Sequence, residues 1–462
     1  MVDFIIQSVN DILIKEFGRS LSDENVHLLD PFTGTGTFIT RLLQSGLIEE
    51  KDLERKYKHE LHANEIVLLA YYIAAINIEN AYHDQTPDPD DGIGKEKYTP
   101  FEGIVLTDTF QLGESQDGEK LFSEMFPQNS KRVQRQQKAP LRIIMGNPPY
   151  SVGQTSANDN AQNQTYFKLN QRIADTYAKL TNATNKNSLY DSYLKAFRWS
   201  TDRLDKTGGI ICFVSNGAWL DGNSTDGFRK SIEKEFSSIY VFNLRGNART
   251  QGEQRRREKG NVFGEGSRTP IAITLLVKNP DVKTEKATIH YHDIGDYLDR
   301  EEKLKLVSSF KSFTNEKMQL ETLLPNEHGD WISVRNDLFG SFIVLAPEKK
   351  FDLKSNSFFT LNSMGVDTSR DAWVVNSSRE KLVSNVKKTI SFYNSQVDEF
   401  KDARMKNPKL DVEKFINRNP FEISWSSSLI PNVERGKKAT YENQKILNVS
   451  YRPFNKLFFI LW

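Results

Sequence analysis

The sequence of 462 residues contains one cysteine and no long apolar segment. The single cysteine, Cys212, excludes an internal disulfide and a zinc site made of several cysteines, which is typical of a reducing compartment. It lies in an apolar run, so a buried strand residue is a better interpretation than a reactive thiol. The sequence has no stretch of about 18 apolar residues and no signal-peptide pattern, so we expect a cytoplasmic protein without a membrane-spanning helix.

An excess of positive charge is also missing. Lysine plus arginine number 62 and aspartate plus glutamate 61, so a nucleic-acid partner would need a local basic surface. Two basic clusters are candidates for contact with DNA phosphates. The first consists of Arg255, Arg256, Arg257 and Lys259, and the second of Lys131, Arg132, Arg135 and Lys138. For both clusters a solvated charged surface is the simpler interpretation.

Motifs for metal and ATP binding are missing too. His59 and His62 have a loose metal-ligand spacing but no third ligand near them in the sequence, so we expect no metal site. The segment 92–95 (Gly-Ile-Gly-Lys) lacks the full spacing of a phosphate-binding loop and the Ser or Thr that follows its lysine. The sequence therefore gives no indication of an ATP site.

Strand and helix patterns alternate over the first two thirds of the chain, which predicts an α/β sheet with helices on both faces. The predicted strands are 26–29, 57–63, 104–106, 141–145, 209–214, 238–244 and 271–277. The predicted helices are 4–17, 37–45, 67–78, 189–204 and 228–236.

The remaining segments define the predicted domains. Residues 151–187 are rich in Asn, Gln, Ser and Thr and are interpreted as a mobile loop within a first domain of residues 1–300. A charged linker over 301–330 is expected to lead to a separate, mixed α+β domain over 331–462. The chain opens directly in a helical pattern and ends in the apolar run 457–462, so we expect a fragment of a larger protein.

A glycine-rich turn follows the first predicted strand. The segment 30–38 (Asp-Pro-Phe-Thr-Gly-Thr-Gly-Thr-Phe) leads into a helix, where glycines let the backbone approach a ligand and the helix N-terminus offers amide donors. The G-x-G-x-x-G spacing of dinucleotide sites is absent, because Ile39 occupies its third position, and Asp30 would repel a pyrophosphate. An acid at this place suits a cationic ligand such as the ammonium and sulfonium of S-adenosylmethionine. A plain glycine turn is the alternative.

Acidic residues follow the next two predicted strands as well. Glu65 is placed to accept both ribose hydroxyls of an adenosyl group, and Asp108 to accept a hydrogen bond from an adenine amino group. Either acid alone is weak support, because most acids at strand ends face solvent. Three acids that end three successive strands, counting Asp30, support an adenosyl cofactor better than any one of them.

Another polar motif, Asn147-Pro148-Pro149-Tyr150, follows the strand predicted over 141–145. Two successive prolines fix φ and remove amide donors, so the segment is held extended with its carbonyls outward. The Asn147 side-chain oxygen and the Pro148 carbonyl would accept the two hydrogens of adenine N6 and localise its lone pair for attack on a sulfonium methyl. Tyr150 would stack on a base that has left the duplex. For the motif alone, a proline turn is the alternative.

With these residues, the chain resembles the amino-methyltransferases of restriction–modification systems. Segment 30–38 looks like the cofactor motif of that family and Asn147–Tyr150 like its catalytic motif, in an order similar to the γ group of DNA adenine-N6 methyltransferases. The resemblance implies a Rossmann-like sheet that binds S-adenosylmethionine. It implies cofactor contacts from Asp30, Phe32, Gly34, Gly36, Phe38, Glu65 and Asp108, and catalytic roles for Asn147, Pro148 and Tyr150.

More narrowly, the chain resembles the methyltransferase and target-recognition part of single-polypeptide type ISP restriction enzymes. The segments that carry this resemblance are 2–9, 189–193, 243–247, 365–373 and 451–454. It implies specific adenine methylation of double-stranded DNA, with nuclease and helicase segments of the same system as further partners. The chain lacks those segments, and it begins after a Tyr-x-Pro-like element that helps to hold the cofactor in relatives. Restriction activity is therefore not expected.

Two other functions remain open. Asn-Pro-Pro-Tyr also occurs in methyltransferases that act on protein glutamine or on RNA bases, although these are compact and would leave the region after residue 300 without a use. The second alternative is a truncated, inactive DNA-specificity module. The missing N-terminal element favours that alternative, whereas the intact Asn147–Tyr150 motif argues against it.

Overall fold

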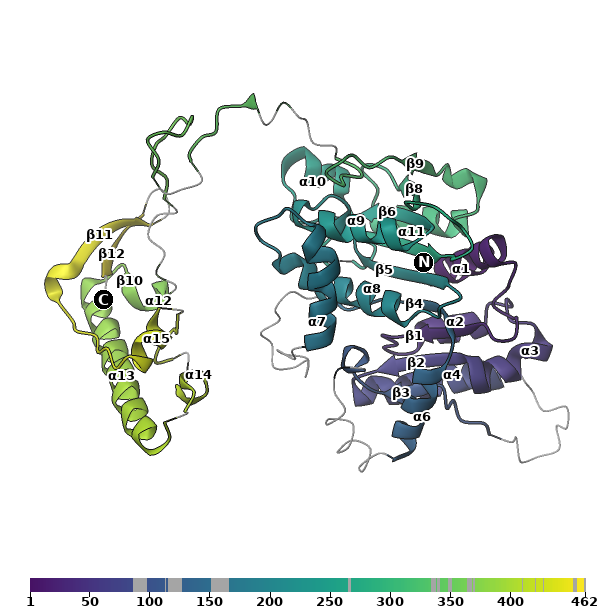
Figure 1. Ribbon diagram of the computed structural model, residues 1–462, viewed down its shortest axis with the longest axis horizontal. Coiled ribbons are helices and arrows are strands. Elements are labelled where there is room, and N and C mark those ends of the chain that lie inside the picture. The colour runs from purple at the N-terminus through teal and green to yellow at the C-terminus, as the bar shows by residue number, and fades with distance from the viewer. Residues whose placement is uncertain are drawn as a thin grey trace. The chain divides into compact units, whose positions relative to one another are not determined.

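A computed structural model of the chain forms two compact units, Met1–Asn336 and Asp337–Trp462 (Figure 1). The structure describes residues 1–85, 98–112, 114, 127–150, 166–264, 267–333, 338, 341–347, 351–363, 368, 370–408, 410–419, 421–426, 428–451 and 455–460. Each unit has hydrophobic cores of its own. Among the described residues, no helix is long and apolar enough to cross a membrane.

The described part of the first unit is built on a mixed sheet of nine strands in the order β3-β2-β1-β4-β5-β7-β6-β8-β9. Strands β1 to β5 are parallel, β7 runs antiparallel between β5 and β6, and β9 runs antiparallel to β8. Every predicted strand has a counterpart here, and β8 and β9 are additional. The strands are β1 His27–Asp30, β2 Leu61–Glu65, β3 Ile104–Leu106, β4 Leu141–Gly146, β5 Gly209–Asn216, β6 Ser238–Arg245, β7 Ile271–Lys278, β8 Thr288–Asp293 and β9 Glu321–Leu323.

Neighbouring residues of the central strands enter two different cores, because successive side chains of a strand point to opposite faces of the sheet. Leu28 and Ile143 lie in the first core, and the next residue in each strand, Leu29 and Ile144, lies in the second. Cys212 is fully buried in β5, as its apolar run predicts.

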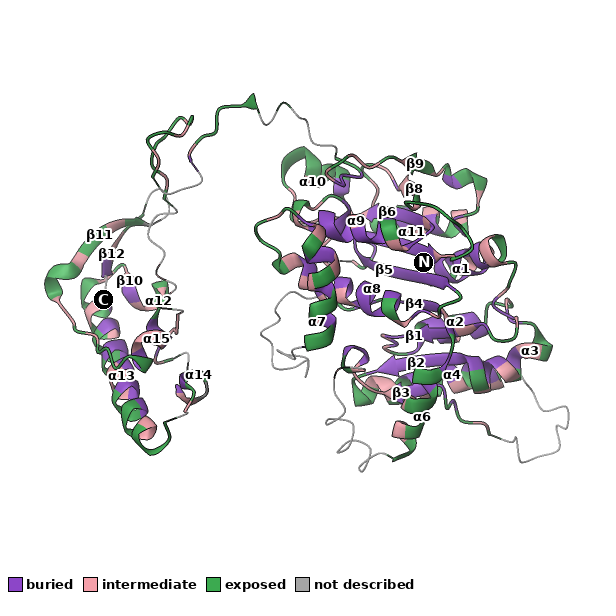
Figure 2. Ribbon diagram, viewed as in Figure 1, coloured by how far each residue is buried: buried purple, intermediate pink, exposed green. Residues whose placement is uncertain are grey.

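Helices cover both faces of this sheet, and Figure 2 shows buried strands between helices with exposed outer sides. The predicted α/β fold is therefore confirmed. Helices packed on the first core are α1 Val2–Phe17, α2 Thr37–Leu43, α3 Glu50–Arg55, α4 Leu68–His83 and α11 Arg300–Phe310. Helices packed on the second core are α7 Phe167–Ile173, α8 Ser192–Arg203 and α9 Asp226–Glu235. Two polar helices are α6 Pro127–Lys138 and α10 Gly252–Glu258.

The structure differs from the predicted boundaries in two segments. Residues 301–330, predicted as a linker, belong to the first unit and contain α11 and β9, so the unit extends to Asn336. A capping box between Asp299 and Glu302 begins α11, and its Val307 is fully buried. Of the predicted mobile loop, residues 151–165 lie outside the described residues, whereas 166–187 contain α7 and buried side chains.

The second unit combines one long helix with a small sheet, which confirms the predicted mixed α+β class. Helix α13, Arg379–Lys406, presents Leu382 and Val386 to a core shared with the sheet, and Val397 and Phe400 to a core shared with short helices. The sheet order is β10-β12-β11. Its strands are β10 Val375–Asn376, β11 Ile446–Tyr451 and β12 Asn455–Ile460, and the short helices are α12 Asp371–Val374, α14 Val412–Phe415 and α15 Leu429–Glu434.

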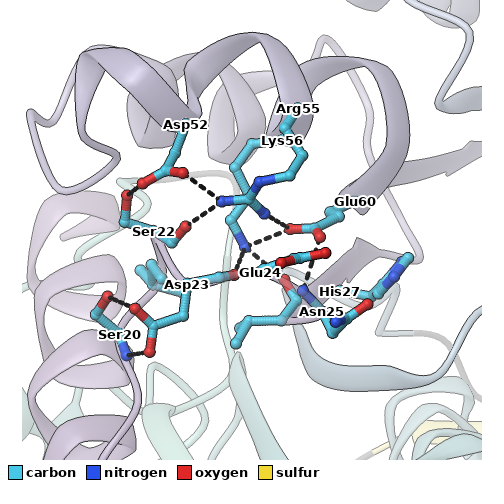
Figure 3. Close-up of polar contacts among 12 residues, drawn as sticks. Ser20, Ser22, Asp23, Glu24, Asn25, His27, Asp52, Arg55, Lys56 and Glu60 are labelled. Carbon is cyan, nitrogen blue, oxygen red and sulfur yellow. Dashed lines mark hydrogen bonds and ion pairs between the residues drawn. The ribbon is translucent and has the colours of Figure 1, made fainter.

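A buried ion pair fixes the entrances of β1 and β2 (Figure 3). The Lys56 side chain is fully buried, and its Nζ lies 2.7 Å from a Glu60 carboxylate oxygen. It also donates to the carbonyls of Asp23 at 2.7 Å and Val26 at 2.9 Å. Burial lowers the pKa of Lys56, and the adjacent Glu60 carboxylate opposes that effect.

Glu60 extends this pair into a network. Its carboxylate accepts from the amide of Asn25 at 2.7 Å and from Arg55 at 2.6 Å. Arg55 in turn donates to the carbonyl of Ser22 and to Asp52, each at 2.7 Å. Residues 56–60 form one turn of π-helix, although residues 57–60 were predicted as the start of a strand. In this turn Lys56 and Glu60 both bind the loop that leads into β1.

Replacing Glu60 by Gln should destabilise the first unit by about 3 kcal/mol, because the substitution leaves the buried Lys56 ammonium without its counter-charge. Urea unfolding followed by circular dichroism measures the change. The matched control is Glu102→Gln, which removes the exposed pair with Arg135; it should leave the transition where it is. Equal shifts for the two variants would contradict the role assigned to the buried pair.

Candidate functional site

The strand order places the candidate site at one edge of the sheet. After β1 the chain adds β2 and β3 on one side and then returns to add β4 and β5 on the other, so the order reverses between β1 and β4. In open α/β sheets, ligands bind at the carboxyl ends of the strands beside such a reversal. Asp30 ends β1 and Gly146 ends β4, so the two sequence motifs flank this point.

Asp30 is a fully buried acid at the end of β1. One carboxylate oxygen accepts from the Phe32 amide at 3.1 Å. The other, Oδ2, is buried without a hydrogen-bond partner among the described residues. Burial raises the pKa of Asp30 to about 7, and the negative charge of Glu65 adds to the effect. A positive group bound nearby would supply the missing counter-charge.

The glycine-rich turn is held against β2 and α4. The amides of Gly34 and Val67 donate to the two carboxylate oxygens of Glu65, at 2.8 and 2.7 Å. Gly34 and Gly36 both have positive φ, and a Cβ on Gly36 would lie 3.1 Å from the carbonyl of Ala74. A side chain at Gly36 would therefore be strained by the positive φ and crowded against α4.

Phe32 and Phe38, both predicted to contact the cofactor, lie in different surroundings. Phe32 is half-buried at the strand ends, with its ring centroid 5.4 Å from that of Phe110. Phe38 lies in α2, is only 6% exposed and packs in the first core. The structure therefore groups Phe32 with the strand-end acids and places Phe38 among core residues.

Asp108 lies in the loop after β3, which is tied to the loop after β1. The Thr109 hydroxyl donates to the Pro31 carbonyl at 2.6 Å and accepts from the Asn64 side-chain amide at 3.1 Å. The Asp108 carboxylate accepts from the Phe110 amide at 3.0 Å and from the Tyr166 hydroxyl at 2.8 Å. Burial raises the pKa of Asp108, although these hydrogen bonds act against it.

Asn147 and Tyr150 contact each other at the end of β4. The Tyr150 hydroxyl donates to the side-chain oxygen of Asn147, and it lies 3.4 Å from the Val214 carbonyl of β5. Asn147 is exposed, whereas Pro148 is buried. Gly146 holds this motif against Asp30, since a Cβ on Gly146 would lie 2.6 Å from an Asp30 carboxylate oxygen. The motif thus presents an oriented amide to solvent beside a buried acid.

The first basic cluster lies in the connection that follows β6, at the same edge of the sheet as Asn147. β6 is three strand spacings from β4, which is about 14 Å. Arg255 donates to the Lys259 carbonyl at 2.6 Å, Arg256 lies 3.4 Å from Glu253, and Lys259 lies 3.8 Å from Glu302. These ion pairs are exposed and therefore weak, so they compete little with a phosphate partner.

The second basic cluster lies in α6, which leads into β4 and therefore ends at the opposite edge of the sheet. Arg132 lies 3.3 Å from the Tyr71 hydroxyl, and Arg135 donates to the Glu102 carbonyl at 2.8 Å. The structure therefore favours the α10 cluster as a neighbour of the strand-end residues.

Three residues of the site lie outside the motifs that were identified in the sequence. Gly146 is needed for the approach to Asp30, Thr109 joins two loops, and Tyr166 holds Asp108. A glycine directly before Asn147 was a usable signal for a close approach. No local pattern marks Thr109 or Tyr166, because their partners are distant in the sequence.

Two family models match the chain. The model described as Eco57I restriction-modification methylase matches residues 56–248, and the model described as Type ISP C-terminal specificity domain matches residues 357–461. The first match contains Glu65, Asp108 and Asn147. A comparison with curated proteins gave no match.

Solved structures of longer enzymes match nearly the whole chain. The type ISP restriction-modification enzyme LlaGI, as a nuclease-deletion mutant in complex with a DNA substrate mimic, is 44% identical with a TM-score of 0.83, over 99% of this chain and 36% of that chain. The ATP-dependent type ISP enzyme LlaBIII bound to DNA is 41% identical with a TM-score of 0.84, and the match covers 99% of this chain and 29% of LlaBIII. DrdV in its complex with DNA is 33% identical with a TM-score of 0.82, and the match covers 100% of this chain and 43% of DrdV. The chain therefore spans less than half the length of these enzymes.

The affinity of the site for a cationic ligand should rise with pH around the Asp30 pKa of about 7. Below that value the carboxyl group is protonated and neutral, and above it the carboxylate attracts the cation. With S-adenosylmethionine as the cationic probe, the association constant measured by calorimetry should increase by up to about tenfold from pH 6 to pH 8. Asp30→Asn should bind weakly at both values. A wild-type affinity that is independent of pH would contradict the role of Asp30 as the counter-charge for the ligand.

Proposed function

Since the chain carries an Eco57I restriction-modification methylase domain and a type ISP specificity domain, we propose that it transfers a methyl group from S-adenosylmethionine to N6 of a flipped adenine. The target would be a specific sequence in double-stranded DNA, and the chain would serve as the modification part of a restriction–modification system. The observation that carries the proposal is the close approach of Gly146, which directly precedes Asn147, to Asp30 at the point where the strand order reverses.

The chemistry of the strand-end acids fits the proposed cofactor. Asp30 has a buried oxygen without a partner among the described residues, so its charge can act over a short distance on a bound ammonium or sulfonium. An ionised carboxylate has about four acceptor positions, so Glu65 and Asp108 can still accept from ribose hydroxyls and an adenine amino group. When bound, S-adenosylmethionine supplies an electrophilic methyl group.

Asn147 and Pro148 would hold the target amino group. The Asn147 side-chain oxygen and the Pro148 carbonyl would accept its two hydrogens and localise the nitrogen lone pair. That lone pair would form the new bond to the methyl carbon while the bond from that carbon to sulfur breaks and the sulfur keeps its electron pair. The Tyr150 hydroxyl fixes the Asn147 side chain, and burial raises the pKa of Tyr150, so the hydroxyl stays a donor. The amino group then loses one proton to water. A base inside a duplex cannot reach this site, so flipping is part of the proposal.

The specificity domain distinguishes the proposal from its alternatives. Methylation of RNA or of protein glutamine leaves residues 357–461 without a role, whereas DNA recognition gives them one. An inactive specificity module would not need an exposed Asn147 oriented by Tyr150.

The proposal includes nuclease and helicase segments of the same system as partners. The enzymes that match are more than twice as long as this chain. Helix α4 also exposes an apolar row, in which Leu69 is 70%, Tyr72 56% and Ile76 55% exposed. Because a helix that is apolar on all sides is normally buried, this row supports a further protein contact.

Asn147→Ala should reduce methyl transfer to duplex DNA by at least about a hundredfold and leave cofactor binding nearly unchanged, because it removes an acceptor that acts on the base alone. Transfer of labelled methyl groups is measured on DNA, RNA and protein. The matched control is Asn80→Ala, an exposed asparagine near the far end of α4. Label on RNA or protein alone would overturn the DNA proposal, and full activity of Asn147→Ala would overturn the role of Asn147.

Joint replacement of Arg255, Arg256 and Lys259 by Gln should weaken DNA binding and reduce its salt dependence. For each lost phosphate contact, the slope of log K against log salt should fall by about 0.9. Fluorescence anisotropy at several salt concentrations measures both effects. A matched variant with Lys131, Arg135 and Lys138 replaced by Gln in α6 should change the slope much less. Equal slopes for the α10 variant and the wild type would exclude the α10 cluster as a DNA contact.

A further inference from the structure

We infer that Tyr166 is a positioning residue that orients the Asp108 carboxylate toward the adenine amino group of the cofactor. This inference rests on the proposed function. Tyr166 immediately precedes α7 and is only 6% exposed, and its hydroxyl donates to Asp108 Oδ2 at 2.8 Å. No sequence motif contains Tyr166, and it lies beyond the catalytic tetrapeptide in the chain.

The two oxygens of Asp108 are fixed by different elements. Oδ1 accepts from the Phe110 amide at 3.0 Å, within the turn that follows β3, and Oδ2 accepts from Tyr166. One hydrogen bond alone would leave the carboxylate free to rotate about its last torsion, which has a broad energy profile. Two bonds from separate elements set the plane of the carboxylate. Its unused acceptor positions then point in a fixed direction, as recognition of a planar amino group requires.

The Tyr166 ring is itself held on two sides. The ring of Phe110 meets it edge-on, with centroids 5.4 Å apart, and Lys195 Nζ lies 5.4 Å from the ring centroid. Phe110 also contacts Phe32 of the glycine-rich turn, at 5.4 Å. A phenylalanine could make these ring contacts equally well. The hydroxyl is therefore the part of Tyr166 that acts on Asp108, and a substitution can remove it alone.

The location favours a functional reason for this hydrogen bond. A half-buried carboxylate loses hydration, and burial raises the pKa of Asp108 despite its hydrogen bonds. An apolar pair at the same place would avoid that cost. Asp108 is an acid with a fixed orientation, and it lies at the strand ends beside the glycine-rich turn. These features are typical of a residue that recognises a ligand.

The test compares two ligands in Tyr166→Phe, which keeps the ring and removes the hydroxyl. One ligand is S-adenosylhomocysteine, and the other is its analogue with hydrogen in place of the adenine 6-amino group. Calorimetry should show about tenfold weaker binding of S-adenosylhomocysteine and less than about twofold weaker binding of the analogue, because a hydrogen bond to a charged group contributes on this scale. Equal weakening of both ligands, or of neither, would overturn the inference.

Two further variants complete the test. Tyr177→Phe is the matched control, because the Tyr177 hydroxyl is buried without a hydrogen-bond partner among the described residues; both ligands should bind it as they bind the wild type. When Tyr166→Phe is added to Asp108→Asn, the affinity for S-adenosylhomocysteine should not fall further. An additional tenfold loss of affinity would contradict the inference that Tyr166 acts through Asp108. If the wild type binds neither ligand, the proposed function fails. If the wild type binds them and Tyr166→Phe binds both with unchanged affinity, only the role assigned to Tyr166 fails.

Discussion

The buried pair between Lys56 and Glu60 is the contact on which the geometry of the first unit depends. It joins the loop before β1 to the π-helical turn before β2 through hydrogen bonds to two carbonyls and one amide of that loop. Both strands end at the candidate site, with Asp30 on one and Glu65 on the other. Their registers are therefore set from the opposite edge of the sheet. Buried ion pairs often contribute more to specifying one arrangement than to net stability, and this pair fits that role.

At the carboxyl edge the charges are arranged differently. Glu65 is satisfied by two backbone amides, whereas Asp30 keeps one oxygen without a partner among the described residues. An unsatisfied buried acceptor costs about 1–3 kcal/mol, so this arrangement is unfavourable for the isolated fold. Functional sites commonly keep such costs, because a bound ligand of opposite charge can recover them. The Lys56–Glu60 network therefore supports the fold at one edge of the sheet, whereas the strand-end acids lie at the edge where we propose that a ligand binds.

Local patterns predicted most of the central sheet, because each core strand is a short apolar run bounded by glycine or polar residues. The prediction was wrong where long-range contacts override local preference. Residues 57–60 were predicted as the start of a strand but form π-helix, in which Glu60 binds Asn25 and Arg55. Residues 301–330 were too charged to suggest a fold element. Lys303, in α11, is nevertheless fully buried, because its ammonium donates to three backbone carbonyls.

The sequence by itself determined the chemical groups of the candidate site and their order along the chain, because the glycine-rich turn and Asn147–Tyr150 are contiguous and carry recognisable residue types. Only the tertiary structure decided which of these groups meet. The approach of Gly146 to Asp30 and the hydrogen bond from Tyr166 to Asp108 join segments that are far apart in sequence. Parallel strands bring their carboxyl ends to one edge of the sheet whatever the length of the connections between them. Because these connections are long, no local sequence pattern contains both partners of such a contact.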